Sequence, residues 1–210
     1  MPPKASILPG DLEAALDQTL RAQARALGVE VDDALAAALG RYLDLLVLWN
    51  RRINLSSVRD PAGIVEKHFV DSLAALPHLP AAARTLVDVG SGAGFPGAVL
   101  ALARPALAVT LVEPIHKKAA FLEALRRELP LPNVTVEIGR VETSPTRADV
   151  AISRATWDLL EWLPRGARLV TPGGLVLGIK GAKTHALPPG ATRHPYALGG
   201  AKRAIITYRE

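Results

Sequence analysis

The chain has 210 residues, of which 49% are hydrophobic, and a formal net charge of +5. This length suits one domain with an added segment, and such a chain can bury a complete core. It contains no cysteine, which excludes disulfides, a thiol nucleophile and cysteine-ligated metal sites. No apolar run reaches about 18 residues, so we expect no transmembrane helix. The N-terminal residues lack the pattern of a signal peptide, and we therefore expect a cytoplasmic protein without membrane contacts.

The positive charge is concentrated in the last quarter of the chain. Residues 162–210 carry eight basic side chains and one acidic side chain, a net charge of +7. Residues 1–83 carry eight basic and ten acidic side chains, and residues 84–161 carry nine of each. The basic segment fits a solvated surface. It also fits a surface that faces nucleic-acid phosphates, because clustered positive charge supplies the sequence-independent part of nucleic-acid affinity.

The first part of the chain shows helical periodicity. Asp11 is expected to cap a helix that runs to about residue 27, and Asp32 to cap a second helix that runs to about residue 49. A third helix is predicted between Asp60-Pro61 and Pro77. Apolar residues of the second helix recur at helical spacing and predict one buried face. They are Leu35, Leu39, Tyr42, Leu43, Leu46 and Val47.

After residue 83 the pattern changes to short apolar runs with helical segments between the early ones. Strands are predicted at residues 85–89, 107–112, 134–138, 148–153, 174–180 and 204–208. Pro172-Gly173-Gly174 is expected to separate a helix ending near Val170 from the fifth strand, and the last stretches look like a hairpin. The order predicts an α/β fold with a doubly wound sheet, mostly parallel with an antiparallel last strand. Residues 1–80 would form an N-terminal helical segment packed on this domain of residues 81–210.

The most informative segment is Leu-Val-Asp-Val-Gly-Ser-Gly-Ala-Gly-Phe-Pro-Gly, residues 86–97. A strand that contains Asp88 runs into a turn with four glycines, where the backbone can approach a ligand closely. The next strand ends in Glu113, roughly 20 residues further on, where nucleotide-binding folds place an acid that holds ribose hydroxyls. Both oxygens of Glu113 can accept such hydrogen bonds. The segment therefore predicts a nucleoside cofactor.

Two cofactors match this turn. Gly92 begins a literal GxGxxG pattern, which predicts an NAD-dependent oxidoreductase. The strand is expected to end at Val89, however, so that pattern should begin at Gly90, and Phe95 then stands where its third glycine belongs. Asp88-x-Gly90-x-Gly92 is instead the spacing of class I methyltransferases. We therefore favour S-adenosylmethionine over a dinucleotide.

Seven motifs in a fixed order extend this interpretation over nearly the whole chain. They are Trp49-Asn50 with Asn54-Leu55, Lys67-His68-Phe69-Val70-Asp71-Ser72-Leu73, the Asp88–Gly97 loop, Glu113 followed by Lys117-Lys118 and Phe121-Leu122, Arg140-Val141-Glu142, Ser153-Arg154-Ala155, and Lys180-Gly181. With these motifs the sequence resembles the bacterial 16S ribosomal RNA guanine-N7 methyltransferase G family, once called glucose-inhibited division protein B. The resemblance implies the class I methyltransferase Rossmann-like fold, with residues 81–210 as the adenosylmethionine-dependent domain.

The resemblance also implies which residues bind the cofactor. The family's ligand residues fall on Gly90, Phe95, Val141, Glu142 and Arg154. Gly90 and Phe95 would lie against the methionine part, and Val141 and Glu142 against the adenine ring. General methyltransferase chemistry adds Asp88, Gly92 and Glu113. An ion pair between Glu142 and Arg140 is an alternative role for that carboxylate.

The implied reaction is transfer of a methyl group to N7 of a guanine in 16S ribosomal RNA, in the segment known as the 530 loop. Guanine N7 carries a lone pair and no proton. Transfer is then an in-line displacement that needs positioning but no obligatory general base or metal.

Arg154 and Lys180, at the ends of the fourth and fifth strands, are expected to border the acceptor pocket together with His68. Lys67, His68 and Asp71 share one helix, where His68 acts as a general base or packs against a neighbouring element.

The expected partner is 16S ribosomal RNA or the small ribosomal subunit, with the protein as a monomer. Two alternatives within this fold remain, a ribosome-binding module that has lost transfer and a methyltransferase of small molecules. The first predicts RNA binding without methyl incorporation, and for the second the basic C-terminal segment would be incidental.

Overall fold

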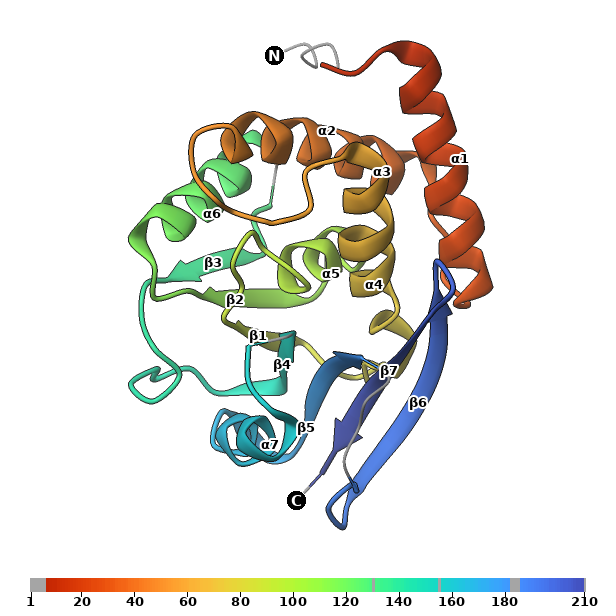
Figure 1. Ribbon diagram of the computed structural model, residues 1–210. Coiled ribbons are helices and arrows are strands. Elements are labelled where there is room, and N and C mark those ends of the chain that lie inside the picture. The colour runs from red at the N-terminus through yellow and green to blue at the C-terminus, as the bar shows by residue number, and fades with distance from the viewer. Residues whose placement is uncertain (1–6, 130, 155, 182–185, 210) are drawn as a thin grey trace.

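Figure 1 shows the computed structural model, which describes residues 7–129, 131–154, 156–181 and 186–209. A seven-stranded sheet with the order β3-β2-β1-β4-β5-β7-β6 forms its centre. The strands are β1 (Thr85–Val89), β2 (Ala108–Val112), β3 (Val134–Glu137), β4 (Ala148–Arg154), β5 (Val170–Gly181), β6 (Ala191–Leu198) and β7 (Ala201–Tyr208). Neighbours from β3 to β5 pair in parallel, and β7 runs antiparallel to both β5 and β6. The predicted mostly parallel sheet with an antiparallel last strand is confirmed.

The predicted end of the helix near Val170 is wrong. Helix α7 (Leu159–Ala167) ends three residues earlier, and Val170 already pairs with Ala148 in the sheet. Val150 pairs next with Leu175, so the residues between Val170 and Leu175 bulge out of the strand. Gly173 has a φ of +78°, which favours glycine and permits this detour. The Pro-Gly-Gly sequence therefore marks a bulge inside β5 rather than a connection before it.

The predicted hairpin at the end of the chain is confirmed. Strands β6 and β7 pair in antiparallel register, with Leu198 opposite Ala201. Gly199 and Gly200 form the turn with φ angles of +51° and +80°. Lys183, one of the basic residues that precede this hairpin, lies outside the described residues.

The first two predicted helices are present as α1 (Gly10–Ala26) and α2 (Asp33–Asn50). Asp32 caps α2 as predicted, since its side chain accepts a hydrogen bond from the Leu35 amide at 2.7 Å. The predicted cap by Asp11 is wrong. Helix α1 begins at Gly10, two residues earlier than a cap at Asp11 would give, with Pro9 in the capping position, so Asp11 lies within the first turn. There its negative charge favours the helix through the dipole.

The third predicted helix is divided into segments of different pitch. It begins as α3 (Pro61–Ile64), widens to the π-helical segment η1 (Val65–Val70) and returns to α-helix as α4 (Asp71–Leu73). A short 3-10 turn, η2 (Leu76–His78), follows. Asp60 caps the start as predicted, accepting from the Gly63 amide at 2.6 Å. The π-helical segment was not predicted, and such widened turns occur often at functional sites.

The helices cover the two faces of the sheet unequally (Figure 1). Helices α5 (Gly97–Ala103) and α6 (His116–Glu128) share one apolar core with α1, α2 and the α3–α4 segment, and residues such as Leu86 and Leu111 face it. Helix α7 covers the other face, where Val87 and Trp162 are buried. The N-terminal helices thus pack on the sheet domain, and the boundary at residue 80 stays a prediction. Among the described residues, no helix is long and apolar enough to cross a membrane.

Two leucines on α2 test whether this helix belongs to the common core. Leu46 is fully buried, whereas Leu48 is 47% exposed. We expect Leu46→Ala to lower the free energy of unfolding by about 2–5 kcal/mol, since it leaves a cavity in a packed core. Leu48→Ala should change it by no more than about 0.5 kcal/mol. Urea unfolding measures both, and equal effects of the two substitutions would contradict the shared core.

Candidate functional site

A cavity of about 480 Å³ lies at the carboxyl ends of β1 and β4. This edge of an open α/β sheet is where such folds bind ligands. Its walls come from the loop after α2, the helical residues 66–71, the glycine turn of residues 90–95, Arg154 and the turn of the β6–β7 hairpin. We call it the main cavity.

A second cavity, of about 200 Å³, lies on the other side of the glycine turn. Its lining includes Pro114 after β2, residues 139–142 after β3 and Trp157 after β4. We call it the side cavity. Gly90 lines both cavities, so the first glycine of the turn stands between them.

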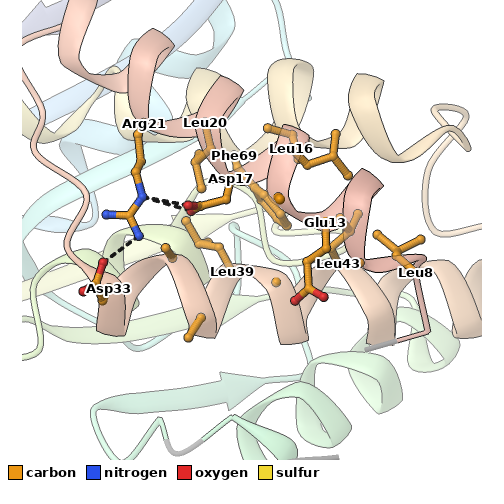
Figure 2. Close-up of a pocket in the computed structure, with 16 residues that line it drawn as sticks. Leu8, Glu13, Leu16, Asp17, Leu20, Arg21, Asp33, Leu39, Leu43 and Phe69 are labelled. Carbon is orange, nitrogen blue, oxygen red and sulfur yellow. Dashed lines mark hydrogen bonds and ion pairs between the residues drawn. The ribbon is translucent and has the colours of Figure 1, made fainter. Parts of the chain in front are cut away.

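A third cavity, of about 380 Å³, lies between α1 and α2 and has a different character (Figure 2). Leucines and Phe69 form much of its lining. At one end Arg21 donates hydrogen bonds to Asp17 at 2.9 Å and to Asp33 at 2.8 Å, so its guanidinium is paired within the wall (Figure 2). The polar groups of the main cavity, in contrast, converge from separate elements on one space, which is typical of a binding site.

The glycine turn has the close backbone approach that the sequence predicts. Gly90 has a φ of +71°, and a Cβ there would lie 2.6 Å from the hydroxyl of Thr156. Gly94 has a φ of +91°, and a Cβ there would lie 3.1 Å from that of Ala98. A side chain at either position would be strained and would crowd a neighbouring element.

Both predicted acids hold this turn through its backbone. Glu113 is 3% exposed, and its carboxylate accepts from the amide of Gly92 at 2.8 Å and from that of Ile115 at 2.9 Å. Asp88 is fully buried and accepts from the Gly97 amide at 2.9 Å. Burial raises the pKa of Asp88 to about 7. Among the described residues, its Oδ1 atom has no hydrogen-bond partner.

Three rings stack beneath the main cavity. Phe95 lies between Tyr42 and His68, with ring centroids 5.3 Å and 4.6 Å apart. The buried Tyr42 hydroxyl donates to the carbonyl of Ala93 at 2.5 Å. The sequence predicts Tyr42 only as a core residue, but it also fixes the glycine turn from the N-terminal segment.

Arg154 connects these groups to the helical wall. Its Nη1 atom donates to the Lys67 carbonyl at 2.8 Å and to Asp71 at 3.1 Å, and its Nη2 atom lies 3.2 Å from His68 Nδ1. The guanidinium carbon lies 5.2 Å from the centroid of the Phe95 ring. The structure therefore brings together Gly90, Phe95, Arg154 and His68, as the sequence predicts.

His68 is held as a neutral imidazole. Its Nε2 atom is hydrogen-bonded to Ser56 Oγ at 2.6 Å, and Asn50 in turn accepts from the Ser56 amide. Burial, followed by the positive charge of Arg154, lowers the pKa of His68 to about 4. These contacts match the interpretation in which His68 packs against a neighbouring element.

The remaining predicted residues lie outside the main cavity. Val141 and Glu142 line the side cavity, and Glu142 lies 3.7 Å from Arg165 on α7 rather than pairing with Arg140. Lys180 stands at the end of β5, but its ammonium group donates to the Trp157 carbonyl and does not line the main cavity.

Several residues of the site were not predicted from the sequence. Ser56, Tyr196 and Arg203 all bond to groups around the main cavity, and Trp157 lines the side cavity. Their partners are distant in the chain, and no local spacing indicates them. The sequence signal that could have suggested Arg203 is the excess of basic residues in the C-terminal quarter.

The fold is that of class I methyltransferases. A methyltransferase from Geobacter sulfurreducens superposes with a TM-score of 0.57 at 16% identity, covering 97% of this chain and all of that one. An S-adenosylmethionine-dependent methyltransferase from Aquifex aeolicus gives a TM-score of 0.54 at 19% identity, covering 70% of this chain and 93% of that one. At these identities the likeness shows the fold alone.

Sequence comparison assigns the family. The family model described as rRNA small subunit methyltransferase G matches residues 35–199. The ribosomal RNA small subunit methyltransferases G of Burkholderia pseudomallei and Burkholderia mallei are each 44% identical over 176 residues, covering 80% of this chain and 76% of theirs. The chain belongs to the rRNA small subunit methyltransferase G family. This confirms the predicted resemblance and favours a methyltransferase over the dinucleotide enzyme.

The lowered pKa of His68 predicts a measurable titration. The imidazole should stay neutral until the pH falls to about 4. An unfolded histidine takes up its proton near pH 6.5. Its contribution to stability is therefore lost as the pH falls from about 6.5 through 4. NMR of the imidazole resonances, assigned with His68→Gln, measures the midpoint, and a midpoint above about 6 would contradict the buried neutral state.

Proposed function

We propose that this protein transfers the methyl group of S-adenosylmethionine to N7 of a guanine in 16S ribosomal RNA, within the 530 loop. The observation that carries the proposal is the pair of cavities on either side of Gly90, in a chain of this family. A donor molecule would lie across the glycine turn. The acceptor base would enter the main cavity.

The residues around the turn fit the two ends of such a donor. Its methionine end would contact Gly90, Phe95 and Arg154 in the main cavity, and its adenine ring would lie by Val141 and Glu142 in the side cavity. The donor supplies a methyl group on a sulfonium, which is electrophilic. The partly buried guanidinium of Arg154 and the close backbone approach at Gly90 suit the charged end of this molecule.

Glu113 and Asp88 have positioning roles in this proposal. Each oxygen of Glu113 carries two lone pairs, so its bonds to Gly92 and Ile115 leave room to accept from a ribose hydroxyl. Asp88 is fully buried and would act on the donor through the Gly97 amide, which it holds at the end of the turn. Gly92, held by Glu113, would approach the donor through its backbone.

Methylation of guanine N7 requires the protein mainly to position the acceptor base against the donor. N7 of guanine attacks with its own lone pair, so no group has to remove a proton. His68, which is neutral and engaged with Ser56, serves as a wall of the acceptor pocket together with Arg154. Orienting the two reactants can contribute up to about 7–11 kcal/mol to such a transfer. Lys180 supports the Trp157 backbone beside the side cavity instead of bordering the acceptor.

The RNA would contact the basic C-terminal quarter of the chain. The exposed Arg193 and Lys202 lie on the β6–β7 hairpin, which forms one edge of the sheet (Figure 1). Clustered positive charge there would attract phosphates of 16S ribosomal RNA or of the small ribosomal subunit. We place this activity in the cytoplasm, with the protein acting as a monomer.

Labelled methyl transfer tests the proposal directly. The protein is incubated with methyl-labelled adenosylmethionine and 16S RNA, both free and as small ribosomal subunits, and N7-methylguanine is then mapped by chemical strand scission. We expect label at one guanine of the 530 loop. RNA binding without label would support the non-catalytic module, and label only on small molecules would support the remaining alternative. Either result would contradict the proposal.

A further inference from the structure

The Asp71 carboxylate connects three separate strands beside the main cavity. It is 1% exposed and lies where the π-helical segment η1 meets α4. Arg154 at the end of β4 donates to it at 3.1 Å. Arg203 of β7 donates through Nε at 2.9 Å and through Nη2 at 2.6 Å, and the Tyr196 hydroxyl of β6 donates at 2.5 Å. This bidentate contact fixes the plane of the Arg203 guanidinium as well as its position.

The charges of this cluster do not cancel. Two guanidiniums share one carboxylate, and Tyr196 stays neutral because burial and Asp71 raise its pKa well above neutral pH. The side chains of Arg154 and Arg203 are 12% and 24% exposed, and both residues line the main cavity. The cluster of Asp71, Arg154 and Arg203 therefore carries a net charge of +1 at the wall of the main cavity.

The contacts also place the hairpin that closes this wall. Leu198, Gly199 and Ala201 line the main cavity at the turn of the hairpin. Tyr196 and Arg203 pair with each other in the sheet next to this turn. Figure 1 shows the turn reaching the lower end of α1 and the neighbouring α3–α4 segment, and Gly199 lies against Glu66 of η1, although more than a hundred residues separate them in the chain. Asp71 thus joins the glycine turn, through Arg154 and Phe95, to the hairpin.

We propose that Asp71 is a positioning residue for methyl transfer. It orients Arg154 toward the donor and fixes the hairpin turn that borders the acceptor base. This inference rests on the proposed function and assigns Asp71 no contact with either reactant. Buried ion pairs often add little net stability, but removal of one partner leaves the other charge uncompensated. Without the carboxylate the two guanidiniums would repel each other and leave their present places.

Asp71→Asn in the full chain tests this role, with Asp149→Asn as the matched control. Asp149 is likewise a carboxylate that accepts hydrogen bonds, from the amides of Arg84 at 2.7 Å and Thr85 at 2.9 Å, but it lies at the opposite end of β4. Calorimetry gives the affinity for adenosylmethionine, methyl incorporation gives kcat and KM for RNA, and thermal unfolding gives Tm. We expect Asp71→Asn to lower kcat and to weaken donor binding, each by about tenfold or more. Asp149→Asn should change Tm alone.

Two more conservative variants test the positioning role of Asp71 if Asp71→Asn does not fold. Tyr196→Phe removes one hydrogen bond to Asp71, and Arg203→Lys keeps the positive charge but loses the bidentate contact with Asp71. Both should lower kcat while Tm stays close to that of the wild-type protein. Unchanged kcat and donor affinity in the folded variants would overturn the inference and leave Asp71 a purely structural residue.

Failure of the positioning role of Asp71 can be distinguished from failure of the proposed function. A wild-type protein that binds adenosylmethionine but labels no RNA contradicts the proposed reaction, while the donor affinities of the variants still test Asp71. A wild-type protein that binds no adenosylmethionine contradicts both.

Discussion

The glycine turn depends on hydrogen bonds that reach it from inside the protein. Glu113 holds the Gly92 amide, Asp88 holds the Gly97 amide, and Tyr42 holds the Ala93 carbonyl. These three groups come from the residue after β2, from β1 and from α2, so sheet and N-terminal segment together set the path of one loop. Because Gly90 on this loop lines both cavities, the position of the loop determines the shape of the whole site.

The N-terminal helical segment is part of the site for the same reason. It supplies Tyr42 beneath the turn, the His68 ring that stacks on Phe95, and the Asp71 carboxylate that pairs with Arg154. The residues of this segment that face the main cavity lie in the loop after α2, on the widened helix η1 and directly after it. The sheet of a class I methyltransferase supplies the carboxyl-end edge, and the added helices complete the wall of the main cavity.

Local signals in the sequence predicted most elements, and long-range contacts decided the rest. Strand β1 and the caps Asp32 and Asp60 were predicted correctly, since each depends on neighbouring residues. The start of β5 was predicted wrongly because the Pro-Gly-Gly sequence of the bulge looks like that of a loop. The bulge is recognised only from the pairing of β5 with β4 across the sheet. The order of motifs predicted Gly90, Phe95 and Arg154 as cofactor-binding residues, and the three line the main cavity together. The contact of Arg203 with Asp71 spans 132 residues and has no signature in local spacing.

Calorimetric titration with adenosylmethionine tests the central claim, that the turn held by Glu113 forms the donor site. Glu113→Gln removes the charge that holds the Gly92 amide, while Glu137→Gln alters a carboxylate on β3 that bonds Ser144 and Thr146. We expect one donor per wild-type chain, affinity about tenfold weaker in Glu113→Gln, and no change in Glu137→Gln. Equal affinities in all three proteins, or binding of NAD in place of adenosylmethionine, would contradict it.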